Sequence, residues 1–408
     1  MSELSTDPYK GVRDFYPADW ATVQAIFQCE RDTLARWGYA EYNASPLERS
    51  ELYESKGNEE IINEQTYTFE DRGGRHVTLR PEMTPTLARM VAAKRRELTY
   101  PLRWFSIGNR FRYERPQKGR LREFYQTDID LIGLPEGEAD LEIVSLASAL
   151  IKNFGATDED FVIRLNARTL LNTACEKVGL KPLAVRAYLR LLDKKAKMPT
   201  PEFDAAVKAI THDDPLKYID QDAMSVMITE LNRRGIKNVR FDPTLTRGFD
   251  YYTGIVFEIF DTNPANPRAL FGGGRYDELV ALFGGEPIPA VGFAIGDVAF
   301  ADFLKTHELL PVPQHELELY LGTPKPENIP SAQEMATVLR TQHLRVFVNL
   351  TAKSLGDQVR EANKRGVPYF AAVGEDEKHS KTLRVKRLAS GEERPLALAD
   401  IAAYIHDT

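Results

Sequence analysis

The 408-residue sequence predicts an α+β protein: an antiparallel-sheet domain interrupted by a helical segment, followed by a small α/β domain. Short apolar runs without regularly interposed helices occupy residues 39–165, a pattern that favours an antiparallel sheet. Helical patterns then replace the strands between about 168 and 237. Beyond Pro311 and Pro313, strands and helices alternate, which is typical of an α/β fold.

The first domain begins with apolar residues spaced three to four apart, which predicts a helix over residues 18–37. Its strand patterns lie at 39–43, 67–69, 76–79, 102–107, 124–131, 239–241, 255–260 and 291–295. The helical patterns of the interrupting segment lie at 169–178, 182–192 and 223–234. In the last domain we expect strands at 317–321, 345–349 and 369–373 and helices at 330–342 and 354–365. The resulting divisions are 1–167, 168–237, 238–312 and 315–408.

The composition is that of an ordinary globular protein, with 43% hydrophobic and 28% charged residues. No apolar run approaches the roughly 18–20 residues that cross a bilayer, and residues 1–7 lack the apolar core of a signal peptide. We therefore expect a cytoplasmic protein without a membrane partner. Cys29 and Cys175 are too few for a disulfide framework or a cysteine-built zinc site, so no protein-bound zinc or other metal is expected.

The net charge of −7 argues against a protein that coats nucleic acid through charge alone. The charge is uneven, however, because residues 315–408 hold 13 Lys+Arg and 13 Asp+Glu and are therefore neutral. This weakly indicates that the C-terminal part can approach a polyanion such as RNA.

Residues 111–124 form a polar, arginine-rich segment between two apolar strands. Ordering such side chains costs conformational entropy, which a functional contact would offset. Guanidinium groups match phosphate oxygens in geometry and charge, so the segment predicts a phosphate-binding hairpin. A merely solvated hairpin is the alternative.

Three further segments combine reactive side chains with unusual backbone. Glu82 and Thr84 would share one side of an extended backbone and could hold an ammonium group, although a helix-capping turn fits equally well. Tyr251 and Tyr252 follow Arg247 in a stretch with a glycine on each side, which indicates a functional role rather than a plain strand. The glycine-rich stretch at 271–277 would let a ligand approach the backbone, or would be only a tight turn.

In this order, these segments resemble those of histidyl-tRNA synthetases, class II enzymes with an antiparallel catalytic sheet. Residues 10–17 (KGVRDFYP) are similar to the family's opening signature, 111–114 (FRYE) to the start of motif 2, and 247–254 (RGFDYYTG) to its histidine-specific signature. The resemblance runs nearly end to end. It implies that ATP activates L-histidine to histidyl-adenylate, that the histidyl group is transferred to tRNA(His), and that the chain is a homodimer. It also implies an insertion at 168–237 and an anticodon-binding domain at 315–408.

The resemblance assigns roles to individual residues. The cage around the ammonium group of histidine would comprise Glu82, Thr84, Gln126 and Asp130, where the family often has Glu in place of Asp130. The residues around the imidazole would be Tyr251, Tyr252 and Tyr276. The residues that contact ATP would be Arg112, Glu114, Arg120, Arg122 and Arg247, with Arg112 and Arg247 as the catalytic pair on the α-phosphate. The residues near the tRNA acceptor stem would be Arg115, Gln117 and Lys118.

The implied reaction is attack of the histidine carboxylate on the α-phosphorus of ATP. A carboxylate is already ionised at pH 7, so no general base is required. The protein's task is to position two anions and to stabilise the charge of the transition state, which suits two fixed arginines. Magnesium would arrive with ATP as part of the substrate.

Motif 3 departs from the family pattern, which ends Gly-x-Glu-Arg, because Val298 and Ala299 stand in the last two places. Either another cation, Arg120 or Arg122, takes the γ-phosphate, or the chain is a non-catalytic, histidine-binding paralogue resembling the regulatory subunit of ATP phosphoribosyltransferase. Those regulators generally lack the C-terminal domain and have a degraded histidine signature. This sequence retains the C-terminal domain and the histidine signature, which favours the enzyme. A nucleic-acid-binding adaptor would leave the tyrosines and arginines unexplained.

Overall fold

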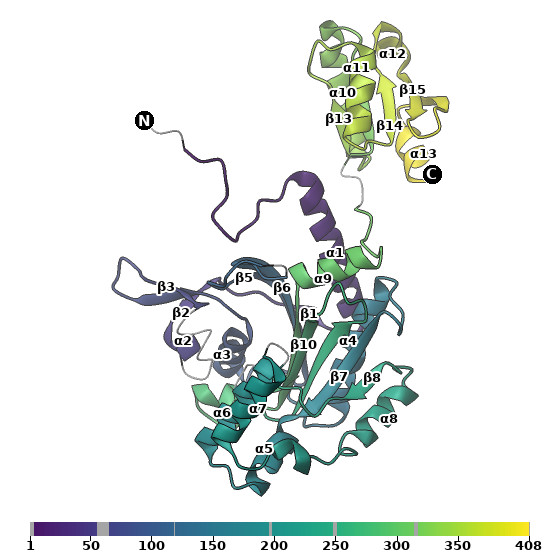
Figure 1. The fold of residues 1–408 in the computed structure, drawn as a ribbon. Helices are drawn as coiled ribbons and strands as arrows, with labels where there is room; N and C mark the ends of the chain where they lie inside the picture. Colours follow the sequence, from purple (N-terminus) through teal and green to yellow (C-terminus); the bar gives the residue numbers. More distant parts are fainter. Residues whose placement is uncertain are drawn as a thin grey trace. The chain divides into compact units, whose positions relative to one another are not determined.

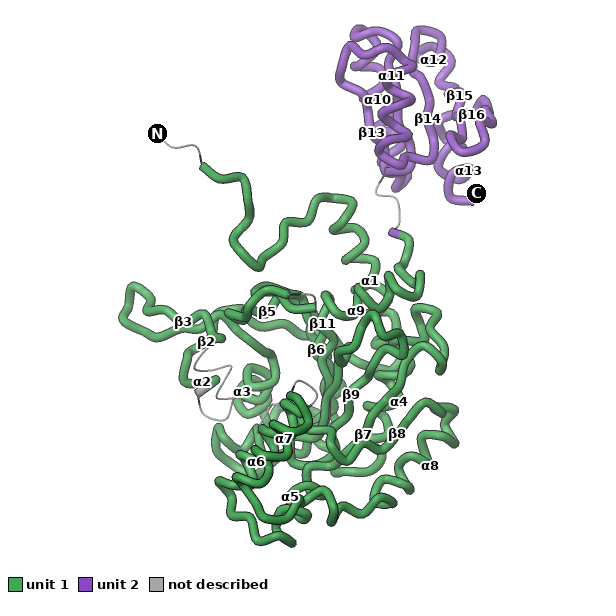
Figure 2. Tube along the Cα trace, in the orientation of Figure 1, with its two compact units in different colours: residues 1–312 green, residues 313–408 purple. Residues whose placement is uncertain are grey.

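The computed structural model describes residues 4–54, 65–117, 119–195, 198–247, 251–313 and 317–407. The chain forms two compact units, Met1–Val312 and Pro313–Thr408, which Figure 2 shows in different colours. Each unit has its own sheet and its own apolar core, so each is described by itself.

The first unit is built on an eight-stranded sheet of order β1-β5-β6-β11-β10-β9-β7-β8 (Figure 1). In that order the strands are β1 (Ala40–Glu41), β5 (Leu102–Phe111), β6 (Glu123–Ile132), β11 (Ala290–Gly296), β10 (Ala269–Arg275), β9 (Ile255–Asp261), β7 (Phe161–Ala167) and β8 (Val239–Phe241). All inner pairs are antiparallel, as predicted. The terminal pairs β1·β5 and β7·β8 are parallel, because α helices separate those strands along the chain.

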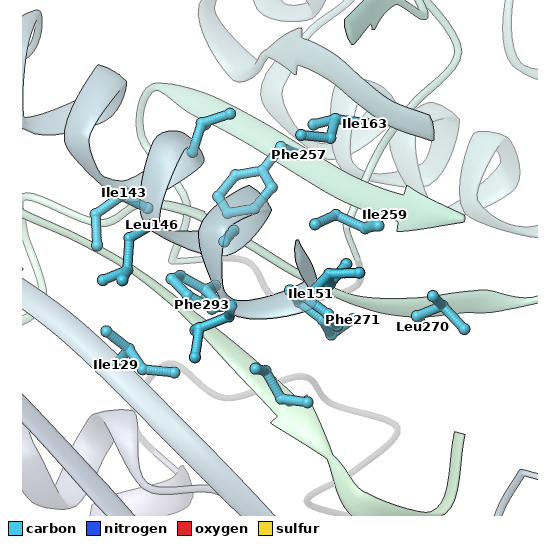
Figure 3. Packing of buried hydrophobic residues seen from close by; sticks show 14 of the residues in the cluster. Ile129, Ile143, Leu146, Ile151, Ile163, Phe257, Ile259, Leu270, Phe271 and Phe293 are labelled. Carbon is cyan, nitrogen blue, oxygen red and sulfur yellow. The ribbon is translucent and has the colours of Figure 1, made fainter. Parts of the chain in front are cut away.

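The helices that contribute to the main core of this unit include α1 (Pro17–Arg36), α4 (Glu138–Asn153) and α9 (Asp297–Thr306). Figure 3 shows Ile143 and Leu146 of α4 beside side chains of the sheet, including Ile129 of β6 and Phe293 of β11. The prediction of strands alone over residues 39–165 was wrong here. Helix α4 is apolar on most of its circumference because most of it is buried, so it lacks the one-sided periodicity that identifies a surface helix.

A second, three-stranded sheet has the order β2 (Leu47–Arg49), β4 (His76–Leu79) and β3 (Tyr67–Glu70). It is followed along the chain by helix α3 (Thr84–Lys94), which the sequence did not predict and which contacts the short helix α2 (Glu51–Glu54). This subdomain sets the position of the turn between β4 and α3.

The helical segment contains α5 (Arg168–Lys177), α6 (Pro182–Lys194), α7 (Thr200–Ile210), the 3-10 helix η3 (Pro215–Tyr218) and α8 (Ser225–Arg233). Helices α5 to α7 share a separate apolar cluster, which includes Leu171, Tyr188 and Phe203. Helix α8 instead contacts α4 and β8, and its Leu231 belongs to the main core. The predicted helical character is confirmed, and α7 is an addition.

The second unit has a five-stranded sheet of order β13-β12-β14-β15-β16. Its strands are β12 (Leu319–Gly322), β13 (Val346–Val348), β14 (Tyr369–Ala372), β15 (Thr382–Arg387) and β16 (Glu393–Ala397). Its helices are α10 (Ile329–Thr341), α11 (Leu355–Lys364), α12 (Glu375–Ser380) and α13 (Ile401–His406). The first three strands are parallel, so the α/β prediction is confirmed, whereas the antiparallel hairpin β15–β16 was not predicted. Within the parts of the chain that the structure describes, no helix has the length and apolarity of a bilayer span.

Candidate active site

A pocket lies on the face of the eight-stranded sheet that Gln126, Asp128 and Asp130 of β6 share. Their intervening neighbour Ile129 points to the core on the other face, because side chains alternate along a strand. The pocket is lined by Glu82, Thr84, Arg112, Gln126, Asp128, Asp130, Arg247, Tyr251, Tyr252, Gly272, Tyr276, Gly292, Phe293 and Ala294. Every residue that the sequence assigned to histidine or to catalysis lies in this set.

Glycines of two strands make room beneath the pocket. The glycine-rich stretch at 271–277 largely belongs to strand β10, so the alternative of a tight turn was wrong. A Cβ atom at Gly272 would collide with the Arg247 guanidinium, and one at Gly292 would collide with the Asp130 carboxyl group. The glycines therefore allow pocket side chains to approach the backbone closely.

Glu82 and Thr84 do not share an extended segment, because Thr84 is the first residue of α3 and Glu82 lies in the irregular stretch just before it. The extended interpretation was wrong, yet both residues reach the pocket. Glu82 is buried and accepts a hydrogen bond of 3.0 Å from the Tyr251 hydroxyl. Burial raises the pKa of Glu82 to about 7, although Arg112 and Tyr251 act in the opposite direction.

Asp130 is the second buried carboxyl group of the pocket. Its Oδ1 atom accepts a short hydrogen bond from the Tyr276 hydroxyl, whereas its Oδ2 atom is buried without a partner. Burial raises the pKa of Asp130 to about 8. The Tyr251 ring centroid lies 5.0 Å from that of Tyr252 and 5.9 Å from that of Tyr276, so three phenol groups meet around the two carboxyls.

Two arginines line the same pocket from segments outside the strands: Arg112 directly follows β5, and Arg247 precedes β9. Arg112 donates from Nε to the carbonyl oxygen of Pro81 (2.9 Å), and its guanidinium lies 5.2 Å from the ring centroid of Phe124 on β6. Arg247 pairs with Glu258 (3.3 Å) and lies against Gly272 of β10. Strand β11 lies between β6 and β10, so Arg112 and Arg247 contact residues of two strands that are not neighbours in the sheet.

The arginine-rich segment connects β5 to β6, and of its described side chains only Arg112 lines the pocket. Arg120 pairs with Glu114 (3.0 Å) and remains exposed. Arg122 donates to the carbonyl oxygen of Glu114 (3.2 Å) and to the Tyr9 hydroxyl (3.0 Å) and stacks 3.9 Å from the centroid of the Tyr113 ring. Arg122 therefore fastens the N-terminal segment to this loop.

The residues expected at the tRNA acceptor stem lie at the tip of the same loop. Arg115 and Gln117 are exposed, and Gln117 accepts a hydrogen bond of 3.0 Å from Arg268. Lys118 lies outside the described residues, as do residues 248–250 of the histidine signature.

At the position of motif 3, α9 begins with Asp297, and Ala299 is half-buried. Asp297 accepts from Arg13 (2.6 Å) and from the backbone N–H of Tyr125 (3.0 Å), which couples the N-terminal segment to the sheet and to α9. The first residue of α9 is therefore a carboxylate, Asp297, and the guanidinium group that pairs with it belongs to Arg13.

Sequence reasoning missed Asp128 and its partner Arg110, which are both buried. Asp128 lies two residues from both Gln126 and Asp130, so the alternation along β6 was a signal that could have found it. Arg110 gave no signal, because its pairing depends on the register of β5 against β6.

Known proteins match this chain over nearly its whole length. The family model described as Histidyl-tRNA synthetase matches residues 11–221 and 199–297, and one described as Anticodon binding domain matches 310–408. A histidine--tRNA ligase of Leptospira biflexa is 38% identical over 412 residues, covering 95% of this chain and 94% of the relative. One of Halobacterium salinarum is 35% identical over 426 residues, covering 98% and 96%.

Solved structures share the fold. The histidyl-tRNA synthetase of Nostoc sp. PCC 7120 superposes with a TM-score of 0.77 at 24% identity, covering 99% of both chains. A Bacillus halodurans C protein described as an ATP phosphoribosyltransferase regulatory subunit/histidyl-tRNA synthetase gives a TM-score of 0.69 at 24% identity, covering 91% of this chain and 98% of that one.

Proposed function

This chain belongs to the histidyl-tRNA synthetase family, and we propose that it activates L-histidine with ATP and transfers the histidyl group to tRNA(His). The observation that carries the proposal is the pocket itself, in which two arginines meet three buried carboxyl groups and three tyrosines. A cationic pair beside a polar, enclosed pocket suits the joining of an amino acid to a nucleotide phosphate.

We assign the histidine ammonium group to the side of the pocket formed by Glu82, Thr84 and Gln126. A carboxylate, a hydroxyl and an amide can together accept the three hydrogen bonds that an ammonium group donates. The resemblance placed Asp130 in the ammonium cage, but we assign it to the imidazole instead: linked to Tyr276, it would accept an imidazole N–H through its unpartnered Oδ2 atom, with Tyr251 and Tyr252 completing that side. An apolar competitor would leave these buried groups unpaired, which is worth ~10⁴-fold in selectivity or more.

In the activation step, an oxygen of the histidine carboxylate forms a bond to the α-phosphorus of ATP as the bond to pyrophosphate breaks. No proton needs to move, because the carboxylate is already ionised. Arg112 and Arg247 would bind the α-phosphate from two sides and stabilise the charge that develops on its oxygens. In the transfer step, a ribose hydroxyl of the tRNA 3′ end attacks the carbonyl carbon, the bond from that carbon to the phosphate oxygen breaks, and AMP leaves as its phosphate takes up the hydroxyl proton.

We assign the remaining phosphate contacts to the loop between β5 and β6. Of the two candidates for the γ-phosphate, Arg120 is better placed, because it is exposed and holds one ion pair with Glu114. Arg122 is engaged by Tyr9 and Tyr113 and would shape the loop. Magnesium would enter as part of the ATP substrate and bridge its phosphates.

For tRNA, we propose that Arg115, Gln117 and Lys118 approach the acceptor stem and that the second unit binds the anticodon. The match of residues 310–408 to an anticodon-binding model supports the second assignment. We also propose a cytoplasmic homodimer, since tRNA and ATP are available there. Strand β1 ends the sheet order within the described residues, and such an edge is suited to an interface.

The test is histidine-dependent exchange of labelled pyrophosphate into ATP, followed by charging of tRNA(His). Exchange that requires histidine and is absent with other amino acids would support the proposal. Tight histidine binding without exchange would instead favour the regulatory-subunit alternative, which the full-length ligase relatives do not favour.

A further inference from the structure

A third carboxyl group, Asp128, lines the pocket between Gln126 and Asp130, and the roles proposed above leave it unused. It is buried and its charge is matched by a fully buried cation, Arg110 of β5. Such a pair is costly to place inside a protein, because both ions lose their hydration. Replacing buried pairs by apolar residues is often neutral or stabilising, so stability alone does not account for it.

The hydrogen bonds of Asp128 divide between two donors. Its Oδ2 atom accepts from Arg110 at 2.5 Å, and its Oδ1 atom accepts from the Gln126 side-chain Nε2 at 2.7 Å. Arg110 is held in turn by a 2.9 Å bond to the carbonyl oxygen of Asn109. Both oxygens of Asp128 are therefore engaged within the protein, and the residue is suited to orienting a neighbour rather than to touching the substrate.

The neighbour it orients is an amide, whose two ends have opposite hydrogen-bonding character. An ionised carboxyl group only accepts, so it selects the NH₂ end of Gln126. The carbonyl Oε1 atom is then the end available to the pocket, where an ammonium group needs an acceptor. Without Asp128, the hydrogen bond that fixes the Gln126 NH₂ group would be lost, and either end of the amide could face the ligand.

We infer that the buried pair Arg110–Asp128 is a positioning device that turns the Gln126 carbonyl toward the substrate's ammonium group and so contributes to selection of an α-amino acid. This inference rests on the proposed histidine specificity. It assigns Asp128 to recognition through Gln126 rather than to direct contact.

The test compares two ligands that differ only in the ammonium group: L-histidine and 3-(imidazol-4-yl)propionate. Their dissociation constants are measured by calorimetry for the wild type and for Asp128→Asn. The asparagine NH₂ group can donate a hydrogen bond to Gln126 Oε1, which allows the Gln126 amide to flip. We expect the histidine constant to rise about 10- to 100-fold while that of the propionate changes little, because one charge-assisted hydrogen bond is lost.

The matched control is Asp140→Asn, which neutralises another buried aspartate paired with a buried arginine, Arg275 (2.9 Å), away from the pocket lining. Its ratio of histidine to propionate affinity should equal that of the wild type. If Asp128→Asn leaves Arg110 unpaired and does not fold, Arg110→Met/Asp128→Asn removes both charges and tests the same orientation.

A double-mutant cycle separates orientation from general packing. In a Gln126→Leu background, Asp128→Asn should cause no further loss of the affinity ratio, since the amide it acts on is absent. A folded Asp128→Asn protein with the wild-type ratio would overturn the inference, as would an equal additional loss in the Gln126→Leu background. A wild type without any preference for histidine would instead overturn the proposed function and this inference with it.

Discussion

Replacing Tyr276 by phenylalanine should move the pH dependence of histidine binding upward. The Tyr276 hydroxyl donates to Asp130 Oδ1, while Oδ2 is already buried without a partner. The substitution therefore removes the hydrogen bond that favours the ionised form of a carboxyl group whose pKa burial raises to about 8.

The magnitude follows from the strength of a hydrogen bond to a charged group, about 1.5–3 kcal/mol, which corresponds to about one to two pKa units. At pH 7 a carboxyl group of pKa about 8 is ionised in about one molecule in ten. In Tyr276→Phe that fraction falls about 10- to 100-fold, and the affinity for histidine at pH 7 should fall with it.

Calorimetric titration of histidine between pH 6 and 8.5 measures the effect. The wild-type affinity should rise across this range as Glu82 and Asp130 ionise, and the Tyr276→Phe profile should be displaced to higher pH. Tyr188→Phe is the control, because it removes a buried hydroxyl bonded to Asp214 in the helical segment and should leave the profile unchanged. Weakening of histidine binding that is as large at pH 8.5 as at pH 6 would refute the reasoning.

Stability without ligand should follow the opposite trend. The folded pKa of Asp130 lies above its unfolded value, so the folded state binds the extra proton in the window between them. This contribution to the free energy of unfolding is complete below about pH 4 and is lost as the pH rises through about 8. Chemical denaturation of the unliganded protein at pH 5 and pH 8 would show whether the sign is correct.

Three further variants test other parts of the site. Arg247→Ala should reduce pyrophosphate exchange by about 10²–10³-fold or more with little change in histidine affinity, as expected for a group that acts on transition-state charge; lost histidine binding would reassign the residue. Glu82→Gln should weaken the affinity for histidine about 10- to 100-fold at pH 8 and abolish the ionisation near pH 7 in the pH profile of binding. If the ionisation near pH 7 is retained, it belongs to another group. Gly272→Ala should lower both the melting temperature and the exchange rate, because its Cβ atom collides with Arg247. In the control Gly296→Ala, the new Cβ atom has open space around it, so the melting temperature should not change. A similar fall in the melting temperature of both variants would contradict this account.

The arginine-rich segment at 111–124 and the glycine-rich segment at 271–277 show which features could not be predicted from the sequence. Residue type at 111–124 and at 271–277 indicated a phosphate site and a close ligand approach. Whether the glycines formed a turn or a strand depended on partners in β9 and β11, which lie elsewhere in the chain. The same holds for Arg122, whose contact with Tyr9 spans 113 residues.

By itself the sequence determined the local and compositional features of this protein. Periodicity marked most helices and strands, and the resemblance to a known family assigned Glu82, Thr84, Gln126 and Asp130 to an ammonium cage and Arg112 and Arg247 to the α-phosphate. Only the tertiary structure decided how these groups act on one another. Tyr251 and Glu82 are 169 residues apart, Tyr276 and Asp130 are 146 apart, and Asp128 meets Arg110 only through strand register. Burial and hydrogen-bond partners set both the pKa of a carboxyl group and the orientation of an amide, and both depend on neighbours brought together from distant parts of the chain.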